Sequence, residues 1–233
     1  MGMSEFQLAT RRKFFHGQAG GIAAAFLAAS GIQTITPQRL PGQTPLSPES
    51  ALAELMAGNK RFTARRMTAD AEDLAILREN TAEKQEPFVA VLSCSDSRVP
   101  VEIIFDQSIG HIFVARVAGN VVSPEIIASL EYGAAVLGTK AMLVLGHANC
   151  GAVKATIHGK DAPGQITALY SRIQPAVDQA GSNLEEAVKA NAKIQSALLR
   201  KASTVISGLV KENKLKVVAG YYDLASGAVT LLD

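Results

Sequence analysis

Residues 87–98 read PFVAVLSCSDSR, a short apolar run that ends in a cysteine and small polar residues. Residues 141–150 read AMLVLGHANC and have the same form, an apolar run followed by histidine and cysteine. Apolar runs of this length are typical of strands buried within a sheet. In open parallel sheets, ligands gather beyond the carboxyl ends of the strands. The two stretches therefore predict an α/β sheet with a functional site at that edge.

The chain has only two cysteines, Cys94 and Cys150, and one lies in each of these stretches. With His147 they offer two thiolates and one imidazole, a ligand set that suits zinc. Three protein ligands leave a coordination position open for water, as in catalytic zinc sites. A Cys94–Cys150 disulfide is one alternative, since disulfides persist in exported proteins. Two unrelated buried cysteines are another.

Asp96 and Arg98 lie two residues apart in the turn that follows the first run. Arginine can hold a carboxylate through two parallel hydrogen bonds. Held ionised in this way, Asp96 would accept a hydrogen bond from a zinc-bound water and orient it. Released from Arg98, Asp96 would itself bind zinc and displace the water in a closed state. The other interpretation is an Asp–Arg pair that only fastens a loop.

The remaining pattern predicts strands that alternate with helices. It indicates an α/β fold with a mainly parallel central sheet, flanking helices and a C-terminal antiparallel edge strand. Ser123 is expected to cap one helix and Gly138 to lie beyond its end, and Gly151 is expected to open the helix after Cys150. The predicted helices are 48–61, 124–137 and 184–210, and the further predicted strands are 112–116, 215–222 and 228–232.

The motifs CSDSR at 94–98 and HANCG at 147–151 resemble the zinc signature of the β-class carbonic anhydrases. The resemblance extends to LMAGNKRF at 55–62, FVARVAGN at 113–120 and VVAGYYD at 217–223, and it covers about residues 47–233. It implies zinc as cofactor, carbon dioxide and bicarbonate as substrates, and a homodimer or higher homo-oligomer with the site near the subunit interface. It also implies substrate contacts from Gln107, Gly119 and Gly151.

In the implied reaction, zinc lowers the pKa of bound water towards ~7, and the hydroxide attacks carbon dioxide. A second enzyme interpretation uses the same site on carbonyl sulfide or carbon disulfide. A third is an exported zinc-binding protein without turnover. His111 is either a proton relay, because histidine titrates near ~6.5, or a plain surface histidine. His158 is interpreted as surface.

The N-terminus carries a separate pattern. Arg11 and Arg12 precede two phenylalanines and a mild apolar stretch at 19–32, the layout of a twin-arginine export signal. We therefore expect residues 1–43 to be signal and linker, residues 44–233 to be the zinc-dependent catalytic domain, and the export machinery to be a partner. The expected location is the periplasm, with an uncleaved membrane anchor as the lesser alternative.

The positive net charge belongs to that N-terminal segment. Of 23 basic and 21 acidic residues, residues 1–43 hold four and one, which leaves 19 and 20 in the predicted domain. No basic patch interleaved with aromatic residues occurs, so we expect no nucleic-acid partner.

Overall fold

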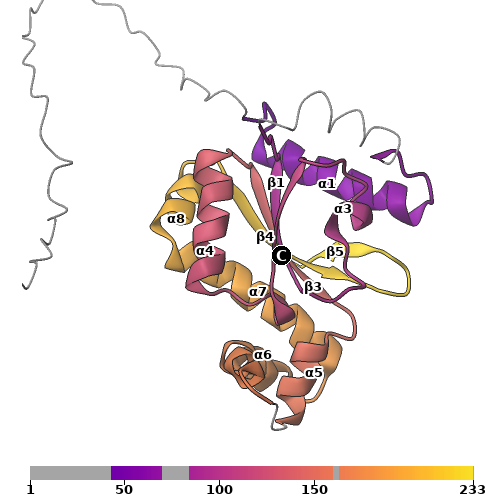
Figure 1. Cartoon of the computed structure of the whole chain (residues 1–233), viewed down its shortest axis with the longest axis vertical. Helices are drawn as coiled ribbons and strands as arrows, with labels where there is room; N and C mark the ends of the chain where they lie inside the picture. Colours follow the sequence, from indigo (N-terminus) through magenta and orange to yellow (C-terminus); the bar gives the residue numbers. More distant parts are fainter. Residues whose placement is uncertain (1–42, 70–83, 160–162, 233) are drawn as a thin grey trace, which may run out of the picture. The chain divides into compact units, whose positions relative to one another are not determined.

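The structure is a computed structural model and describes residues 43–69, 84–159 and 163–232. A five-stranded sheet with strand order β2-β1-β3-β4-β5 lies at its centre (Figure 1). β1 to β4 are parallel, and β5 runs antiparallel to β4 at one edge, which confirms the predicted fold class. The strands are β1 (Val89–Ser93), β2 (Ile112–Arg116), β3 (Ala141–His147), β4 (Lys216–Tyr222) and β5 (Val229–Leu231).

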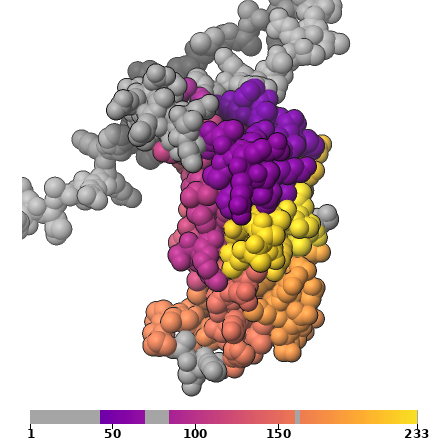
Figure 2. Space-filling view, turned by 90° about the vertical axis from the view of Figure 1, so that its right-hand side faces the viewer, coloured from indigo at the N-terminus to yellow at the C-terminus, as the bar shows by residue number. Residues whose placement is uncertain are grey.

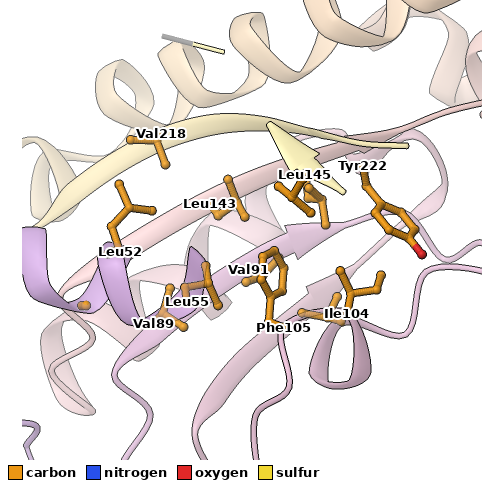
Figure 3. Close-up of a cluster of buried hydrophobic side chains, with 14 of the residues drawn as sticks. Leu52, Leu55, Val89, Val91, Ile104, Phe105, Leu143, Leu145, Val218 and Tyr222 are labelled. Atoms are coloured by element: carbon orange, nitrogen blue, oxygen red, sulfur yellow. The ribbon is translucent and has the colours of Figure 1, made fainter. Parts of the chain in front are cut away.

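Helices cover both faces of this sheet, which explains the unbroken apolar runs. α1 (Pro48–Thr63) and α3 (Val101–Ile104) pack on one face, against Val89 and Val91 (Figure 3). The intervening Ala90 and Leu92 face the other side, where the helices are α4 (Pro124–Glu131), α7 (Leu184–Ala202) and α8 (Thr204–Lys211). A strand buried on both faces has no reason to alternate apolar with polar residues.

α1 begins at Pro48, as its cap sequence predicts. The Ser47 hydroxyl accepts a hydrogen bond from the Ser50 N–H at 3.1 Å, and proline occupies the first turn. Near the helix end, the Asn59 amide donates to the carbonyl groups of Ile104 and Gly227. α1 and the C-terminal β-hairpin therefore lie side by side at the surface, although they are far apart in sequence (Figure 2).

Two predicted helices differ from the structure. The helix expected at 124–137 is α-helical only to Glu131 and continues as a π-helical turn, η3 (Tyr132–Val136), before Gly138 adopts φ +76°. The helix expected at 184–210 breaks at Ser203, whose hydroxyl caps α8 by accepting from the Ile206 N–H at 3.0 Å. Serine is a strong N-cap residue, so the chain can end one helix and start another there without losing a turn.

The carboxyl edge of the sheet is covered by shorter elements, several of which the sequence did not predict. They enclose a third apolar cluster, which includes Cys94, Cys150, Val121 and Ile173. These elements are η2 (Ala118–Asn120), α5 (Gly151–His158), η4 (Ile166–Leu169) and α6 (Tyr170–Ala180).

The predicted export signal, including Arg11 and Arg12, lies in residues 1–42, outside the described part of the chain. Among the described residues, no helix is long and apolar enough to span a bilayer.

Candidate metal centre

The three predicted zinc ligands meet at the carboxyl ends of two neighbouring strands. Cys94 follows β1, His147 is the last residue of β3, and Cys150 is the N-cap of α5. β2 lies on one side of β1 and β3 on the other, so the chain reverses its direction across the sheet at this point. Such a topological switch point is where open α/β sheets bind ligands.

The ligand atoms of Cys94, His147 and Cys150 all lie within 4.8 Å of one another, and all three side chains are buried. Both cysteines are free thiols, so the structure contradicts the disulfide alternative. The two cysteines are also not unrelated, since one cluster holds both. Two sulfurs and one imidazole nitrogen at this spacing are a suitable donor set for zinc.

His147 gives the most direct sign of a metal. Its Nδ1 lies 2.9 Å from the Ala148 carbonyl oxygen, which can only accept, so we assign the proton to Nδ1. Its Nε2 is buried and has no hydrogen-bond partner. A buried nitrogen with a free lone pair is costly unless something binds it. Metal-binding histidines have this arrangement, with the second ring nitrogen held by a backbone carbonyl.

The two sulfurs differ in acidity. A hydrogen bond from Cys150 is the largest cause that lowers the pKa of Cys94 to about 4, and the Gly119 N–H adds to it against the effect of burial. The same sulfur–sulfur hydrogen bond, together with burial, raises the pKa of Cys150. Cys94 is therefore the first thiol to ionise, and zinc binding would release the remaining proton from Cys150.

Asp96 and Arg98 form the predicted two-bond pair. The Arg98 guanidinium donates from Nε to Oδ1 at 2.9 Å and from Nη2 to Oδ2 at 2.7 Å. The Arg98 backbone N–H also donates to Oδ1 at 2.9 Å. These hydrogen bonds hold the pKa of Asp96 well below its usual range, and the bond from the Arg98 side chain has the largest effect. Asp96 Oδ2 lies 3.9 Å from His147 Nε2, so an ionised carboxylate borders the cluster.

Arg116, at the end of β2, is a residue of this region that the sequence did not indicate. Its Nε donates to the Cys94 carbonyl oxygen at 2.9 Å, and its Nη2 donates to the Asp96 carbonyl oxygen at 2.6 Å. It thus holds the backbone of the segment that presents Cys94 and Asp96. The only signal in the sequence is an arginine at a strand end, and the pairing of Arg116 with Ser93 is what brings it within reach.

Of the predicted substrate-binding residues, Gly119 and Gly151 lie beside the ligands. The Gly119 N–H donates to Cys94 Sγ at 3.3 Å, and Gly151 is the exposed first residue of α5. Gln107 is buried elsewhere, with its amide donating to the Phe105 carbonyl at 3.2 Å. No described hydrogen bond joins Gln107 to the cysteines or to His147, so its role stays a prediction.

The two further histidines of the sequence analysis lie at the surface. His111 is exposed before β2, with its ring in a T-shaped contact with Phe88, and His158 is exposed at the end of α5. Within the described residues, neither belongs to the Cys-His-Cys cluster.

Comparison with known proteins identifies the family. Residues 89–229 match the family model described as carbonic anhydrase. The chain is 34% identical over 193 residues to a carbonic anhydrase of Mycolicibacterium smegmatis, covering 79% of this chain and 93% of that protein. It is 33% identical over 202 residues to carbonic anhydrase 2 of Mycobacterium tuberculosis, covering 83% and 96%.

Solved structures agree with this result. The Coccomyxa β-carbonic anhydrase in complex with acetazolamide superposes with a TM-score of 0.62 at 28% identity, over 78% of this chain and 86% of that one. The β-carbonic anhydrase CafA of Aspergillus fumigatus gives 0.63 at 27% identity, over 79% and 90%. The chain belongs to the carbonic anhydrase family, and its fold is that of the β class.

Proposed function

We propose that Cys94, His147 and Cys150 hold the zinc ion with which this carbonic anhydrase interconverts carbon dioxide and bicarbonate. The observation that carries the assignment is the unpartnered His147 Nε2, whose cluster with the two cysteine sulfurs spans at most 4.8 Å. When bound, zinc supplies a Lewis acid that makes water a nucleophile near neutral pH. The protein supplies the position, orientation and charge of the groups around that water.

Asp96 is the group we propose to orient the reacting water. An ionised carboxylate can only accept hydrogen bonds, and Arg98 keeps Asp96 ionised. Arg98 donates twice to Oδ1 and once to Oδ2, which leaves acceptor capacity on Oδ2, the oxygen 3.9 Å from His147 Nε2. By accepting one O–H of the water, Oδ2 would turn an oxygen lone pair towards the carbon of carbon dioxide.

Arg98 has a second task in this proposal. Its two side-chain hydrogen bonds hold the Asp96 carboxylate, and so would keep it from binding a zinc ion held by the two cysteines and His147. It also donates to the Asn149 carbonyl at 3.3 Å, and so joins the segment after β1 to the turn between His147 and Cys150. If Asp96 left Arg98, the same carboxylate would become a zinc ligand, which is the closed state of the proposal.

For substrate binding we keep Gly119, Gly151 and Gln107. A Cβ atom built on Gly151 would meet no atom within 4 Å, so the space beside this residue is open. The proposed role of Gln107 rests on the family resemblance, because its own contacts lie with α1 and the residue after α3.

Stopped-flow carbon dioxide hydration, with zinc content measured on the same sample, tests the proposal. We expect about one zinc per chain and turnover in the wild type, and loss of both in Cys150→Ala. Asp96→Asn should keep zinc but lose turnover and change its pH profile, while Asp178→Asn, an exposed carboxylate change on α6, should keep both. Zinc without turnover would direct attention to carbonyl sulfide and carbon disulfide. Full zinc content in Cys150→Ala would refute the ligand assignment.

We also propose that the protein forms a homodimer or a higher homo-oligomer. Large apolar side chains are exposed on η3, which packs against Phe113 of the edge strand β2, and on α3. They are Tyr132 and Val136 of η3 and Ile103 of α3, each about half exposed. The tetrameric β-carbonic anhydrases of Sordaria macrospora share the fold, with a TM-score of 0.63 at 21% identity. Light scattering coupled to size-exclusion chromatography tests this, and a monomer at micromolar concentration would contradict it.

Export by the twin-arginine route to the periplasm is a further proposal, and it rests on the sequence of residues 1–43 alone. A folded reporter fused to residues 1–45 should appear in the periplasm. The double change of Arg11 and Arg12 to lysine should keep it in the cytosol. A wild-type fusion that stays cytosolic would refute the proposal.

A further inference from the structure

The N–H group that donates to Cys94 Sγ belongs to the loop that follows β2. This loop, residues 117–122 and hereafter the Gly119 loop, runs from the end of β2 to the start of α4. Gly119 has φ +75° within it, and its N–H donates to Cys94 Sγ at 3.3 Å. Hydrogen bonds to a thiolate favour its charged form and adjust its strength as a metal ligand. Whatever fixes this loop therefore acts on Cys94.

Two buried amides of α7 hold it, together with Arg172 of α6, whose Nη1 donates to the Val122 carbonyl oxygen at 2.8 Å. The Asn191 amide donates to the Gly119 carbonyl oxygen at 2.8 Å, and the Gln195 side-chain oxygen accepts from the Val122 N–H at 2.8 Å. Gln195 also donates to Asn191 Oδ1 at 3.2 Å and to the Arg172 carbonyl oxygen at 3.0 Å. The two side chains are therefore hydrogen-bonded to each other, to Gly119 and Val122 of the Gly119 loop, and to α6.

Three of the seven buried residues of α7 are polar, and two of these three, Asn191 and Gln195, carry amides. Asn191 and Gln195 are one turn apart and each is 1% exposed, whereas Val188, Ala192 and Leu199 on the buried side of the same helix are apolar. Burying an amide is costly unless it is hydrogen-bonded, and an apolar residue would pack there without that cost. The cost is offset by bonds to the Gly119 loop, which has no other described hydrogen bond from α7.

We propose that Asn191 and Gln195 are positioning residues that hold the Gly119 N–H on the Cys94 sulfur and so set the affinity of the metal centre. This inference rests on the zinc ligands proposed above. The amides contact neither the ligands nor the substrate by any described hydrogen bond, and they act through the backbone of Gly119. A purely structural role would require only that they satisfy the loop's backbone groups during folding.

Three variants separate the two roles. Asn191→Leu removes the donor to Gly119 at similar volume, and Asn191→Asp keeps the shape and the acceptor for Gln195 but loses the amide donor. Ser196→Ala is the matched control, because Ser196 is equally buried on α7 and bonds only to Lys193 of its own helix. Circular dichroism and thermal denaturation without metal establish the fold of each protein.

Two measurements report on Cys94. Zinc affinity is measured by competition with a chromophoric chelator, and the thiolate-to-metal charge-transfer band is recorded on the cobalt-substituted protein. Loss of an outer partner of a metal ligand weakens binding by about 10–100-fold, and we expect about tenfold here because Asn191 acts through one intermediate group. The band should move to longer wavelength, since a sulfur that receives a weaker hydrogen bond gives up electrons more easily.

Wild-type affinity and an unmoved band in a folded Asn191→Leu or Asn191→Asp protein would overturn the inference. The same holds if Ser196→Ala shows equal changes, or if both Asn191 variants fail to fold, because the amides would then serve the fold. Failure of the zinc assignment looks different: the wild type itself would show no thiolate-to-cobalt band.

Discussion

Replacing Gly119 by alanine tests how closely the Gly119 loop is packed. Gly119 has φ +75° and ψ 14°, a left-handed conformation that costs a residue with a Cβ about 1–2 kcal/mol. The added Cβ would also lie 2.7 Å from Ile173 Cδ1 and 3.2 Å from Ala152 Cβ. Overpacking of this kind costs about 1–3 kcal/mol. The two contributions predict that Gly119→Ala lowers the free energy of unfolding by about 2–5 kcal/mol.

Two further variants separate these contributions. Gly159→Ala, at the end of α5, has nearly the same backbone conformation at φ +58° and ψ 25°, but its Cβ would meet nothing within 4 Å. It should show the backbone cost alone, about 1–2 kcal/mol. Ile173→Val removes the Cδ1 methyl, at a cost of about 0.5–1.5 kcal/mol by itself. In the Gly119→Ala background the same change removes the closest contact, so the double variant should be more stable than the sum of the single effects predicts.

Urea denaturation of the wild type and the four variants measures these free energies directly. We expect the double variant to depart from additivity by about 1 kcal/mol or more, because the two changed atoms are in contact. Additivity within about 0.5 kcal/mol would show that Ile173 does not confine the loop. A Gly159→Ala effect as large as that of Gly119→Ala would assign the whole cost to the backbone and refute the packing argument.

Three other predictions concern charge, a buried amide and the metal. Arg98 lowers the pKa of Asp96, so their pairing stabilises the fold fully above the unfolded-state carboxyl pKa of about 3.9 and less as pH falls below that value. The difference in unfolding free energy between wild type and Arg98→Gln should therefore shrink below that pH. A difference that stays constant with pH would contradict this prediction. Asn59→Leu removes the hydrogen-bond partner of the Ile104 and Gly227 carbonyls and of the Val229 N–H. It should lower the free energy of unfolding, measured by chemical denaturation, by at least about 3 kcal/mol. A decrease below about 1 kcal/mol would mean that water replaces the amide. Chelation should lower the melting temperature of the wild type but not that of Cys150→Ala, and equal shifts would place the metal elsewhere.

The strands were predictable because of where they lie. β1 and β3 are buried along their whole length, and helices on both faces require apolar residues at consecutive positions. β2 was also found with its observed bounds, although it is a half-buried edge strand. The serine–glycine pair at 226–227 indicates a hairpin turn before β5 and so favours an antiparallel edge strand, and Gly227 has φ +74° there.

The helices show where a periodic pattern stops being informative. Apolar positions continue at helical spacing through Ser203, so periodicity alone cannot show the break between α7 and α8. That break depends on Ser203 capping α8 and donating to Glu131 at 2.6 Å, a contact between residues far apart in sequence. α6 was missed for another reason: it contains Pro175, and in it only Ile173 and Ala176 are buried. A proline within a weakly apolar segment favours a loop when only local sequence is considered.

In the metal centre, too, some residues can be predicted from the sequence and others cannot, and the difference has a chemical cause. Its proposed ligands are rare residue types whose chemistry is distinctive, so the sequence alone singles out Cys94, His147 and Cys150. Their supports are common residues that act on backbone groups, as Arg116 does on two carbonyls and Asn191 does on Gly119. A backbone carbonyl or N–H is present at nearly every position, so the sequence does not indicate which of these groups a side chain will contact. Strand register and helix packing are what place a support residue beside the backbone group that it holds. The fold is therefore needed to identify the residues that we propose to adjust the site, whereas the proposed ligands can be predicted from the sequence.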